Sequence, residues 1–425
     1  MLQPRLALAA LLLAPVTALP VPAAAQTVAK PVKIDKARID RMLAAMVKDK
    51  RAVGVSAMVW QGGRERYFGA AGLADREANR PMTRDTLVQI FSMTKPVTGV
   101  ALMQLWEQGK FGLDDPVSRY IPEFADARVY AGKDAAGVPL YRPAARPMTI
   151  RDLLRHTGGL TYGGDDNPVD ALFRTADPLN LDNDLATLTK RIAGLPLAFD
   201  PGTQWRYSAS VDIQGRLVEI FSGQTLEAYV RQHVFDPLGM KDSGWTQPAD
   251  RFGRLAIGYE KTKDGALVRL PEERVKANNF AGHRLTMGGA GIVAPIDDYM
   301  RFARMLLNHG TLDGARALKP STVRLMSTDQ LDPRITERYW LPNKGAVGFG
   351  FDFAVRVSPP KSAEEARGAV GEFFWDGALS TLFWVDPAND LAAVFFVQRF
   401  PFDGTLHHDI REAVYGAGYQ GPPGD

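Results

Sequence analysis

The chain of 425 residues is 45% hydrophobic and 9% aromatic, and its formal net charge is +3 at pH 7. It contains no cysteine, which excludes disulfides, thiol catalysis and cysteine-ligated metals. Lysines and arginines are scattered rather than grouped in blocks, so the charge pattern does not support nucleic-acid binding. This length and apolar content suffice for a large core of two or three packing units.

The first 25 residues are typical of a secretory signal peptide. Arg5 precedes an apolar run over residues 6–14, and Ala23-Ala24-Ala25 offers a small-residue cleavage site. The apolar run is too short to cross a bilayer comfortably, which argues against a membrane anchor. We therefore expect cleavage before Gln26, a periplasmic location, and no stable membrane insertion of the mature chain.

The next segments predict a helix and two strands. Residues 37–49 have the apolar spacing of a helix, and residues 53–73 alternate as two strands around a Gln-Gly-Gly turn. The apolar sequence VTGVALMQLW after Thr94-Lys95-Pro96 predicts a buried helix.

The middle of the chain has a different character. It predicts a short helix over 149–156 with a threonine cap, and further helices over 184–195, 225–235 and 296–309. Residues 163–183 are rich in Asp, Pro and Asn, which indicates a long irregular loop of the kind that often lines sites.

The C-terminal part predicts three strands, over 368–375, 380–386 and 390–398, followed by a helix over 407–416. Short turns favour antiparallel pairing, so both chain ends are expected to meet in one sheet covered by terminal helices.

The expected fold class is therefore α+β, with one antiparallel sheet flanked by helices and a mainly helical part. The sheet and its helices would come from about 37–110 and 330–417, and the helical part from about 111–329. Together they would form a single catalytic unit over residues 26–425.

Two segments place a lysine three residues after a serine. In Ser358-Pro-Pro-Lys361 the prolines favour an extended chain that rises about 3.1 Å per residue, which holds the two side chains apart. In Ser92-Met-Thr-Lys95 the helix that follows places both side chains on one face. A helix start favours an oxyanion near Ser92, and a buried Lys95 with a lowered pKa can act as its base. The alternative for this motif is a serine cap with a solvated lysine.

Other catalytic schemes lack their motifs. There is no Gly-x-Ser-x-Gly elbow, no His-Glu-x-x-His pattern and no phosphate-loop or dinucleotide glycine signature. His407 and His408 are neighbours that point apart on a helix, and His156 is expected to serve packing or capping. Neither a metal nor an organic cofactor is expected.

Several longer motifs then occur in order over residues 37–417, nearly the whole mature chain. Together they resemble the serine β-lactamase-like superfamily, in particular its class C-like branch, which includes the family VIII carboxylesterases. The motifs are FSMTK, GLDDPVSRYIPEF, TIRDLLRHTGGL, FDPLGMKDSGW, MGGAGIVAPIDDYMRFARMLLNHG and WDGALSTLFWVDP.

The resemblance implies a β-lactamase/transpeptidase-like fold with Ser92 as the acylated nucleophile and Lys95 as its partner in proton transfer. The family's Tyr-x-Asn motif corresponds to Tyr207-Ser-Ala209, which keeps the tyrosine and replaces the asparagine by alanine. By this resemblance Tyr207, as a phenolate stabilised by Lys95, takes the serine proton and later activates water.

The family's Lys-Thr-Gly strand motif corresponds here to Trp375-Asp376-Gly377, closer to the Trp-Gly-Gly of the esterase branch. The resemblance implies that the N–H groups of Ser92 and Ala378 form an oxyanion hole. Trp375 and Tyr162 are expected to shape the acyl pocket. A carboxylate at Asp376 disfavours substrates that carry a carboxylate, unless its side chain turns away from the cleft.

The sequence therefore predicts a serine hydrolase that cleaves small carboxylic esters through an acyl-enzyme. Its expected partners are small-molecule esters or amides. The alternatives are a β-lactamase or D-alanyl-D-alanine carboxypeptidase, and a catalytically silent binding relative. Transfer of the acyl group to an alcohol or amine also stays open, as do the natural acyl group and the oligomeric state.

Overall fold

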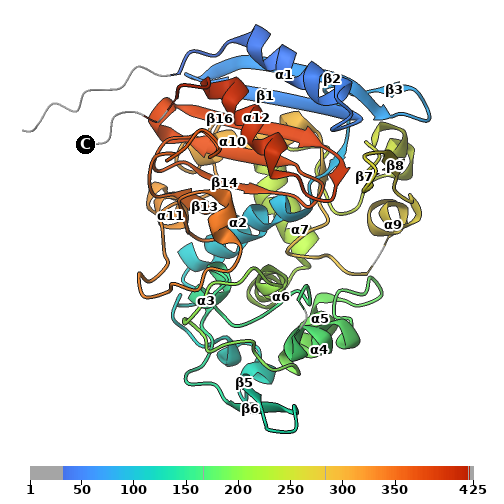
Figure 1. Cartoon of the computed structure of the whole chain (residues 1–425). Coiled ribbons are helices and arrows are strands. Elements are labelled where there is room, and N and C mark those ends of the chain that lie inside the picture. The colour runs from blue at the N-terminus through green and yellow to red at the C-terminus, as the bar shows by residue number, and fades with distance from the viewer. Residues whose placement is uncertain (1–31, 166, 283, 420, 422–425) are drawn as a thin grey trace, which may run out of the picture.

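The computed structural model describes residues 32–165, 167–282, 284–419 and 421, so the expected signal peptide lies outside the described residues. An eight-stranded sheet occupies the upper half of the molecule in Figure 1. Its strand order is β12-β13-β14-β15-β16-β1-β2-β3, and every pairing is antiparallel. The expected antiparallel sheet and α+β class are confirmed.

The sheet joins the two ends of the chain. The strands are β1 Gly54–Gln61, β2 Arg64–Asp75, β3 Arg80–Pro81, β12 Val347–Phe349, β13 Ala354–Arg356, β14 Phe373–Asp376, β15 Leu382–Asp386 and β16 Leu391–Val397. β1 pairs along its length with β16, from Val55 opposite Val397 to Gln61 opposite Leu391. The strands expected in residues 53–73 are β1 and β2, joined at Gly62 and Gly63, which both have positive φ.

Helices cover both faces of the sheet. α1 (Lys36–Lys48) and α12 (Gly404–Tyr415) lie together on one face, and α10 (Ile296–Leu307) packs on β15, β16 and β1. Neighbouring residues of β15 point to opposite faces. Phe383 packs against Tyr299 of α10, whereas Trp384 donates a hydrogen bond through Nε1 to the Tyr415 hydroxyl of α12 at 3.0 Å.

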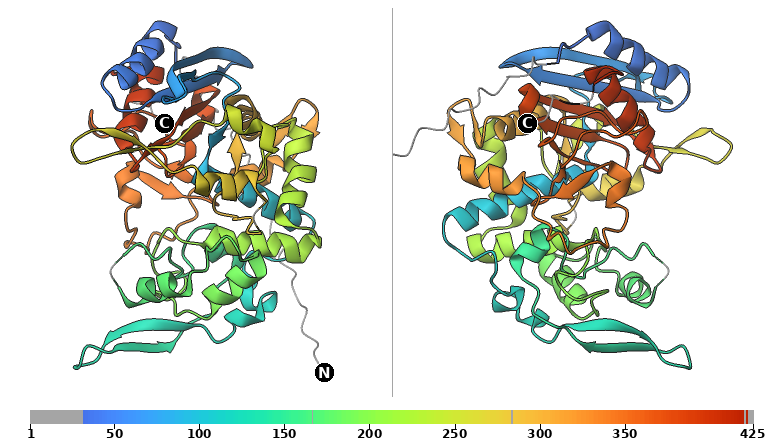
Figure 2. Two further views of the ribbon diagram at one scale, coloured as in Figure 1. Left: turned by 90° about the vertical axis from the view of Figure 1, so that its right-hand side faces the viewer. Right: turned by 60° about the vertical axis from the view of Figure 1, so that its left-hand side comes forward.

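A mainly helical layer lies below the sheet in Figure 1 and in both views of Figure 2. The long helix α2 (Thr94–Glu107) packs against α6 (Ser210–Ser222) and α7 (Leu226–Val230), and nearly all of its residues are buried. The remaining helices are α3 Ile150–Leu154, α4 Pro168–Ala176, α5 Leu185–Ala193, α8 Asp236–Leu238, α9 Glu273–Val275 and α11 Pro320–Met326.

Short strand pairs complete the structure. They are β4 Val88–Gln89 with β9 Val293–Ala294, β5 Arg128–Lys133 with β6 Pro139–Pro143, β10 Thr311–Leu312 with β11 Ala315–Arg316, and the group of β7 Tyr259–Lys261, β8 Leu267–Arg269 and β17 Arg399–Phe400. The β5–β6 hairpin projects from the lower end of the molecule in Figure 2.

One expected feature is wrong. Residues 163–183 do not form one irregular loop, because α4 lies inside them. Asn167 caps this helix by accepting a hydrogen bond from the Asp170 N–H at 3.0 Å, and Pro168 follows in the first turn, where its missing N–H costs little. The cap and the proline outweigh the loop-like composition of the segment.

Of the helices in the described residues, none combines the length and apolar character needed to span a membrane.

Candidate active site

Ser92 lies at the start of α2, in the single 3₁₀ turn Phe91–Met93 that leads into the helix. The preceding residue, Phe91, has φ +45°, a left-handed conformation that non-glycine residues rarely adopt. This strained turn fixes the direction of the Ser92 side chain. Pro96 falls within the first turn of α2, as expected from its position after Lys95.

Lys95 is buried beside the serine, with only 1% of its surface exposed. Its Nζ donates hydrogen bonds to Ser92 Oγ at 3.2 Å and to the Gly289 carbonyl at 2.7 Å. Burial lowers the pKa of Lys95 to about 8, against the opposing effect of three carboxyls at longer range, on Asp212, Asp352 and Asp376. A fraction of the amine is therefore neutral at physiological pH, and its burial rules out a solvated lysine.

Tyr207 lies next to this pair. Lys95 Nζ is 4.6 Å from the centroid of the Tyr207 ring, and Trp375 Nε1 donates to the Tyr207 hydroxyl at 3.4 Å. Burial raises the pKa of Tyr207, an effect that its hydrogen bond with the Ser92 hydroxyl partly offsets. The side chain at rest is therefore favoured as a neutral phenol that can both donate and accept a proton.

Behind Lys95 lies a buried group that the sequence analysis did not single out. Asp212, in the first turn of α6, accepts hydrogen bonds from the Gly289 N–H at 3.0 Å and from the Tyr162 hydroxyl at 3.4 Å. Burial raises the pKa of Asp212 and holds the pKa of Tyr162 well above its ordinary value. Since Gly289 presents its carbonyl to Lys95, Asp212 and Tyr162 fix the backbone that orients the lysine.

The strand β14 forms the opposite wall. Trp375 is buried against Tyr207, with ring centroids 5.3 Å apart. Asp376 lines the cavity next to Ser92 and forms an ion pair with Lys344. The ammonium of Lys344 is also 5.0 Å from the centroids of the Trp340 and Trp375 rings. Asp376 thus faces the cleft, but a neighbouring cation compensates its charge.

Gly377 brings the end of β14 against the serine turn. A Cβ added at Gly377 would lie 2.5 Å from the Ile90 carbonyl oxygen, two residues before Ser92, so only glycine permits this approach. Ala378 follows directly and lines the same cavity as Ser92. Ser92 and Ala378, the two residues expected to supply the oxyanion donors, thus line the same cavity.

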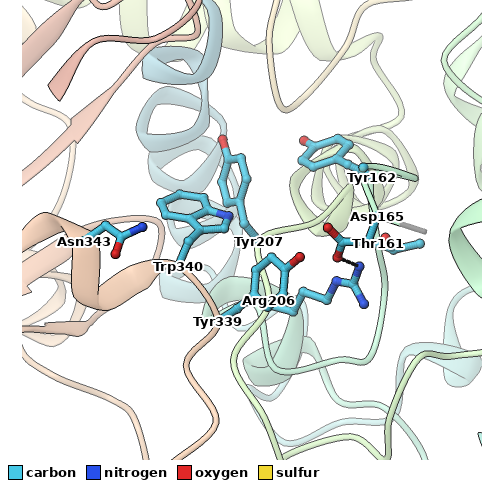
Figure 3. A pocket seen from close by; sticks show the side chains of 9 residues that line it. Thr161, Tyr162, Asp165, Arg206, Tyr207, Tyr339, Trp340 and Asn343 are labelled. Carbon is cyan, nitrogen blue, oxygen red and sulfur yellow. Dashed lines mark hydrogen bonds and ion pairs between the residues drawn. The ribbon is translucent and has the colours of Figure 1, made fainter. Parts of the chain in front are cut away.

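Two cavities open at this cluster. The larger, of about 940 Å³, is lined by Ser92, Tyr207, Lys344, Asp376 and Ala378 among others. A second cavity of about 580 Å³ shares Tyr207 and Trp340 with it, and Figure 3 shows its side chains. In that view Tyr162 and Trp340 stand on either side of Tyr207. An ion pair of 2.5 Å joins Arg206 to Asp165 below them.

His156 packs behind the site, whereas His407 and His408 line the cavity of Ser92, with His407 Nδ1 3.9 Å from Asp376 Oδ2. The His156 ring is buried 5.0 Å from the ring of Tyr207, and its Nδ1 lies 3.2 Å from Ser208 Oγ, so it packs beneath the tyrosine as expected. His407 Nε2 bonds with the Ser380 carbonyl at 2.9 Å, and His408 Nε2 with the Ala363 carbonyl at 2.9 Å. Within the part of the chain that the structure describes, no group of three possible ligands is placed to hold a metal ion.

The rival serine and lysine are also separated from the site. Ser358 and Lys361 lie in an irregular segment after β13, without the helix that places Lys95 beside Ser92. The Lys361 N–H bonds with Glu365 at 2.8 Å in a local turn.

Comparison with known proteins agrees with this geometry. The model of the Beta-lactamase family matches residues 39–416. Esterase EstB of Burkholderia gladioli is 32% identical over 401 residues, which cover 89% of this chain and 95% of the relative. A lovastatin esterase of Penicillium rubens is 31% identical over 347 residues, which cover 78% of this chain and 85% of the relative.

Among solved structures, EstCE1, described as a hydrolase with promiscuous acyltransferase activity, aligns with a TM-score of 0.73 and 27% identity. The alignment covers 89% of this chain and 98% of that one. The family match extends over nearly all of the described residues, and the two relatives named above, both more than 30% identical, are named as esterases. The chain belongs to the Beta-lactamase family, and it is a serine hydrolase related to the family VIII carboxylesterases.

Proposed function

We propose that the protein hydrolyses small carboxylic esters through an acyl-enzyme on Ser92. The observation that carries this proposal is the 3.2 Å hydrogen bond between Ser92 Oγ and a fully buried Lys95, at the edge of a cavity that also contains Ala378. A serine becomes nucleophilic when an adjacent base accepts its proton, and an amine with a pKa of about 8 can do so near neutral pH.

In the acylation step Ser92 Oγ attacks the ester carbonyl while its proton passes to the neutral amine of Lys95. The N–H groups of Ser92 and Ala378 donate to the oxyanion of the tetrahedral intermediate. When the C–O bond breaks, the departing alkoxide takes a proton from Tyr207, which regains one from the Lys95 ammonium. Water then repeats the sequence with the acyl-enzyme and releases the acid.

The neutral state favoured for Tyr207 supports this relay over a resting phenolate. A phenol between Lys95 and the leaving group can pass a proton without first losing one. Asp212 and Gly289 hold the amine in place through the Gly289 backbone.

The strand opposite the serine supports esters over β-lactams and peptides. Trp375-Asp376-Gly377 has a tryptophan where the lactamase motif has its lysine and a carboxylate where the motif has its threonine, and the Lys344 ammonium beside Asp376 is already paired with that carboxylate. A substrate carboxylate would meet no free cation at this position. A neutral ester loses nothing there, since it brings no charge to compensate.

The acceptor of the acyl group forms a second candidate function. EstCE1 is described as a hydrolase with promiscuous acyltransferase activity, and a further relative, 28% identical over 370 residues, is named as a methylbutanoyltransferase of Penicillium citrinum. An acyl-enzyme does not determine its acceptor, so an alcohol bound in place of water would receive the acyl group.

We also propose export to the periplasm with a mature chain beginning at Gln26, which an intact-mass measurement of the exported form would test.

The test uses nitrophenyl esters, with nitrocefin as the β-lactam probe. We expect hydrolysis of the esters, weak or absent turnover of nitrocefin, and a loss of at least about 10³-fold in kcat for Ser92→Ala. Ser358→Ala is the matched control, because it removes the serine of the rival motif, and it should retain parental activity. Equal rates for Ser92→Ala and the parent would refute the mechanism. Rapid nitrocefin turnover would instead favour the β-lactamase alternative. A folded protein that a fluorophosphonate does not label would favour the catalytically silent relative.

A further inference from the structure

A third cavity, of about 520 Å³, adjoins the site. It shares Ala378 with the cavity of Ser92, and Phe91, the residue before the serine, forms part of its wall. Its large apolar lining residues include Phe91, Leu179, Leu255, Leu270, Met287 and Leu379. The volume lies within the range of about 300–1,000 Å³ that is common for small-molecule sites.

The walls of this cavity offer little to a charged ligand. Its one carboxylate, on Glu272, is paired with Arg269 and with Lys276, the latter at 3.0 Å. Gly258 lies in the wall without a side chain. A Cβ there would be 2.9 Å from Leu270 and 3.2 Å from Leu379, so the glycine keeps this space open. An unbranched hydrocarbon chain fits these surroundings better than a polar group does.

The three cavities differ in whether Tyr207 lines them. Both the 940 Å³ and the 580 Å³ cavities are lined by Tyr207, whereas the apolar cavity is not. In the proposed reaction the leaving alcohol must reach Tyr207 to be protonated, and the carbonyl oxygen points to the N–H groups of Ser92 and Ala378. The acyl chain then departs from the carbonyl carbon on the side away from Tyr207.

We propose that the apolar cavity bounded by Phe91, Leu270 and Leu379 binds the acyl chain of the substrate, and that the alcohol occupies the cavities beside Tyr207. This proposal rests on the proposed function of Ser92 and adds its substrate class, esters of medium-length aliphatic acids. It also reassigns Tyr162. That residue was expected from sequence to shape the acyl pocket, but it lines the 580 Å³ cavity and so contacts the alcohol.

Two isomeric esters separate the two sides of the site. Ethyl octanoate and octyl acetate have the same composition, but the first carries its long chain on the acyl side and the second on the alcohol side. Burial of one methylene is worth up to about fourfold in kcat/KM, so the parent should prefer ethyl octanoate.

Leu270→Trp fills the apolar cavity from a half-buried position. We expect it to lower kcat/KM for ethyl octanoate at least about tenfold, since several methylenes lose their site, and to leave octyl acetate and nitrophenyl acetate within about twofold. Val268→Trp is the matched control. Val268 lies two residues away, in β8, and is 50% exposed. The substitution therefore adds the same tryptophan side chain outside the cavity.

An equal loss for both isomers, a loss for octyl acetate alone, or no change in Leu270→Trp would overturn the assignment. Leu179→Trp, which fills the cavity from a different segment, decides the matter if Leu270→Trp does not fold. Nitrophenyl acetate separates this outcome from failure of the proposed function, because its acyl group is too short to occupy the cavity. Hydrolysis of that ester by Ser92→Ala would remove the basis of both proposals.

Discussion

At the scale of single residues, the chemistry of the site depends on how Lys95 is buried. Its ammonium would lose most of its hydration on burial, and among the described residues no carboxylate forms an ion pair with it. The polar partners it does have, Ser92 Oγ and the Gly289 carbonyl, accept hydrogen bonds from the neutral amine as well as from the ammonium. Burial therefore shifts the equilibrium towards the neutral base without leaving the nitrogen unpartnered.

A pH dependence follows from the protonation state of Lys95. The proposed reaction needs the neutral amine, and its pKa is lowered to about 8, so kcat/KM should rise with pH, about tenfold per unit below pH 8, and level off above it. Initial rates with a non-ionisable ester, corrected for spontaneous hydrolysis, measure this profile. Lys95→Arg should be inactive across the range, since a guanidinium is not deprotonated, whereas Lys361→Arg should match the parent. A flat profile between pH 6 and 9 would contradict the role of Lys95.

The sequence predicted the residues of the site that motifs identify. The spacing of Ser92 and Lys95 on one helical turn follows from the apolar helix behind them, and Tyr207 follows from its place in the family pattern. Asp212, Gly289 and Lys344 were missed as site residues. They reach the site only through tertiary contacts, Gly289 being 194 residues from Lys95 and Lys344 being 32 residues from Asp376.

At the scale of elements, the turn that follows β14 determines where the oxyanion donors lie. β14 pairs with β15 up to Asp376 opposite Leu382, and Gly377 donates its N–H to the Thr381 carbonyl at 3.0 Å. The turn is thus fixed from within the sheet, while Ser92 is fixed by α2. The position of Ala378 relative to Ser92 depends on the close approach of Gly377 to Ile90.

Gly377→Ala should therefore impair catalysis more than stability. Its Cβ would lie 2.5 Å from the Ile90 oxygen and would also meet Thr381 Oγ1, so one of the two backbones must move. A displacement of about 1 Å at Ala378 predicts a fall in kcat of about 10²-fold. Gly253→Ala is the matched control, because nothing lies within 4 Å of a Cβ at that exposed position. Steady-state kinetics and a thermal melt measure both effects, and parental kcat in Gly377→Ala would refute the argument.

The elements themselves were predictable where periodicity and caps agree. Thr149 caps α3 through the Asp152 N–H, as the sequence indicated, and the strands around Trp375 pair as expected. α6 was missed, although Gly223 ends it in a left-handed conformation, and so was the β5–β6 hairpin. The hairpin has exposed hydrophobic residues, Val138 and Leu140, in place of a clear buried face, which removes the alternation that would have identified it.

At the scale of the whole molecule, the sheet closes the fold by joining residues from both ends of the chain. β1 and β16 are more than 300 residues apart in sequence, and the helices α1 and α12 follow the same pairing on one face. Short turns and strong strand patterns made this arrangement predictable. The side chains that bind the C-terminal helix to the sheet were not predictable, because they are charged groups inside the core.

Glu372, just before β14, is the centre of these partners. Its buried carboxylate accepts hydrogen bonds from Arg356 Nε of β13 at 3.0 Å and from Arg411 Nη1 of α12 at 2.8 and 2.9 Å. The guanidinium of Arg411 also stacks 4.7 Å from the Phe374 ring and 4.8 Å from the Trp384 ring. The Glu372 carboxylate thus pairs with two buried cations, of which Arg356 also pairs with Glu365 at 3.4 Å, and it connects sheet and helix.

Glu372→Gln keeps the shape of this side chain but removes its charge, and it leaves Arg356 and Arg411 as buried cations without their shared anion. Breaking a buried ion pair in this way costs about 3–5 kcal/mol, so the urea midpoint of unfolding should fall clearly. Glu364→Gln makes the same change at an exposed position and should leave the midpoint unchanged. Equal midpoints for the two variants would mean that the apolar contacts of α12 with the sheet are sufficient, and that the ion cluster adds no stability to the joined chain ends.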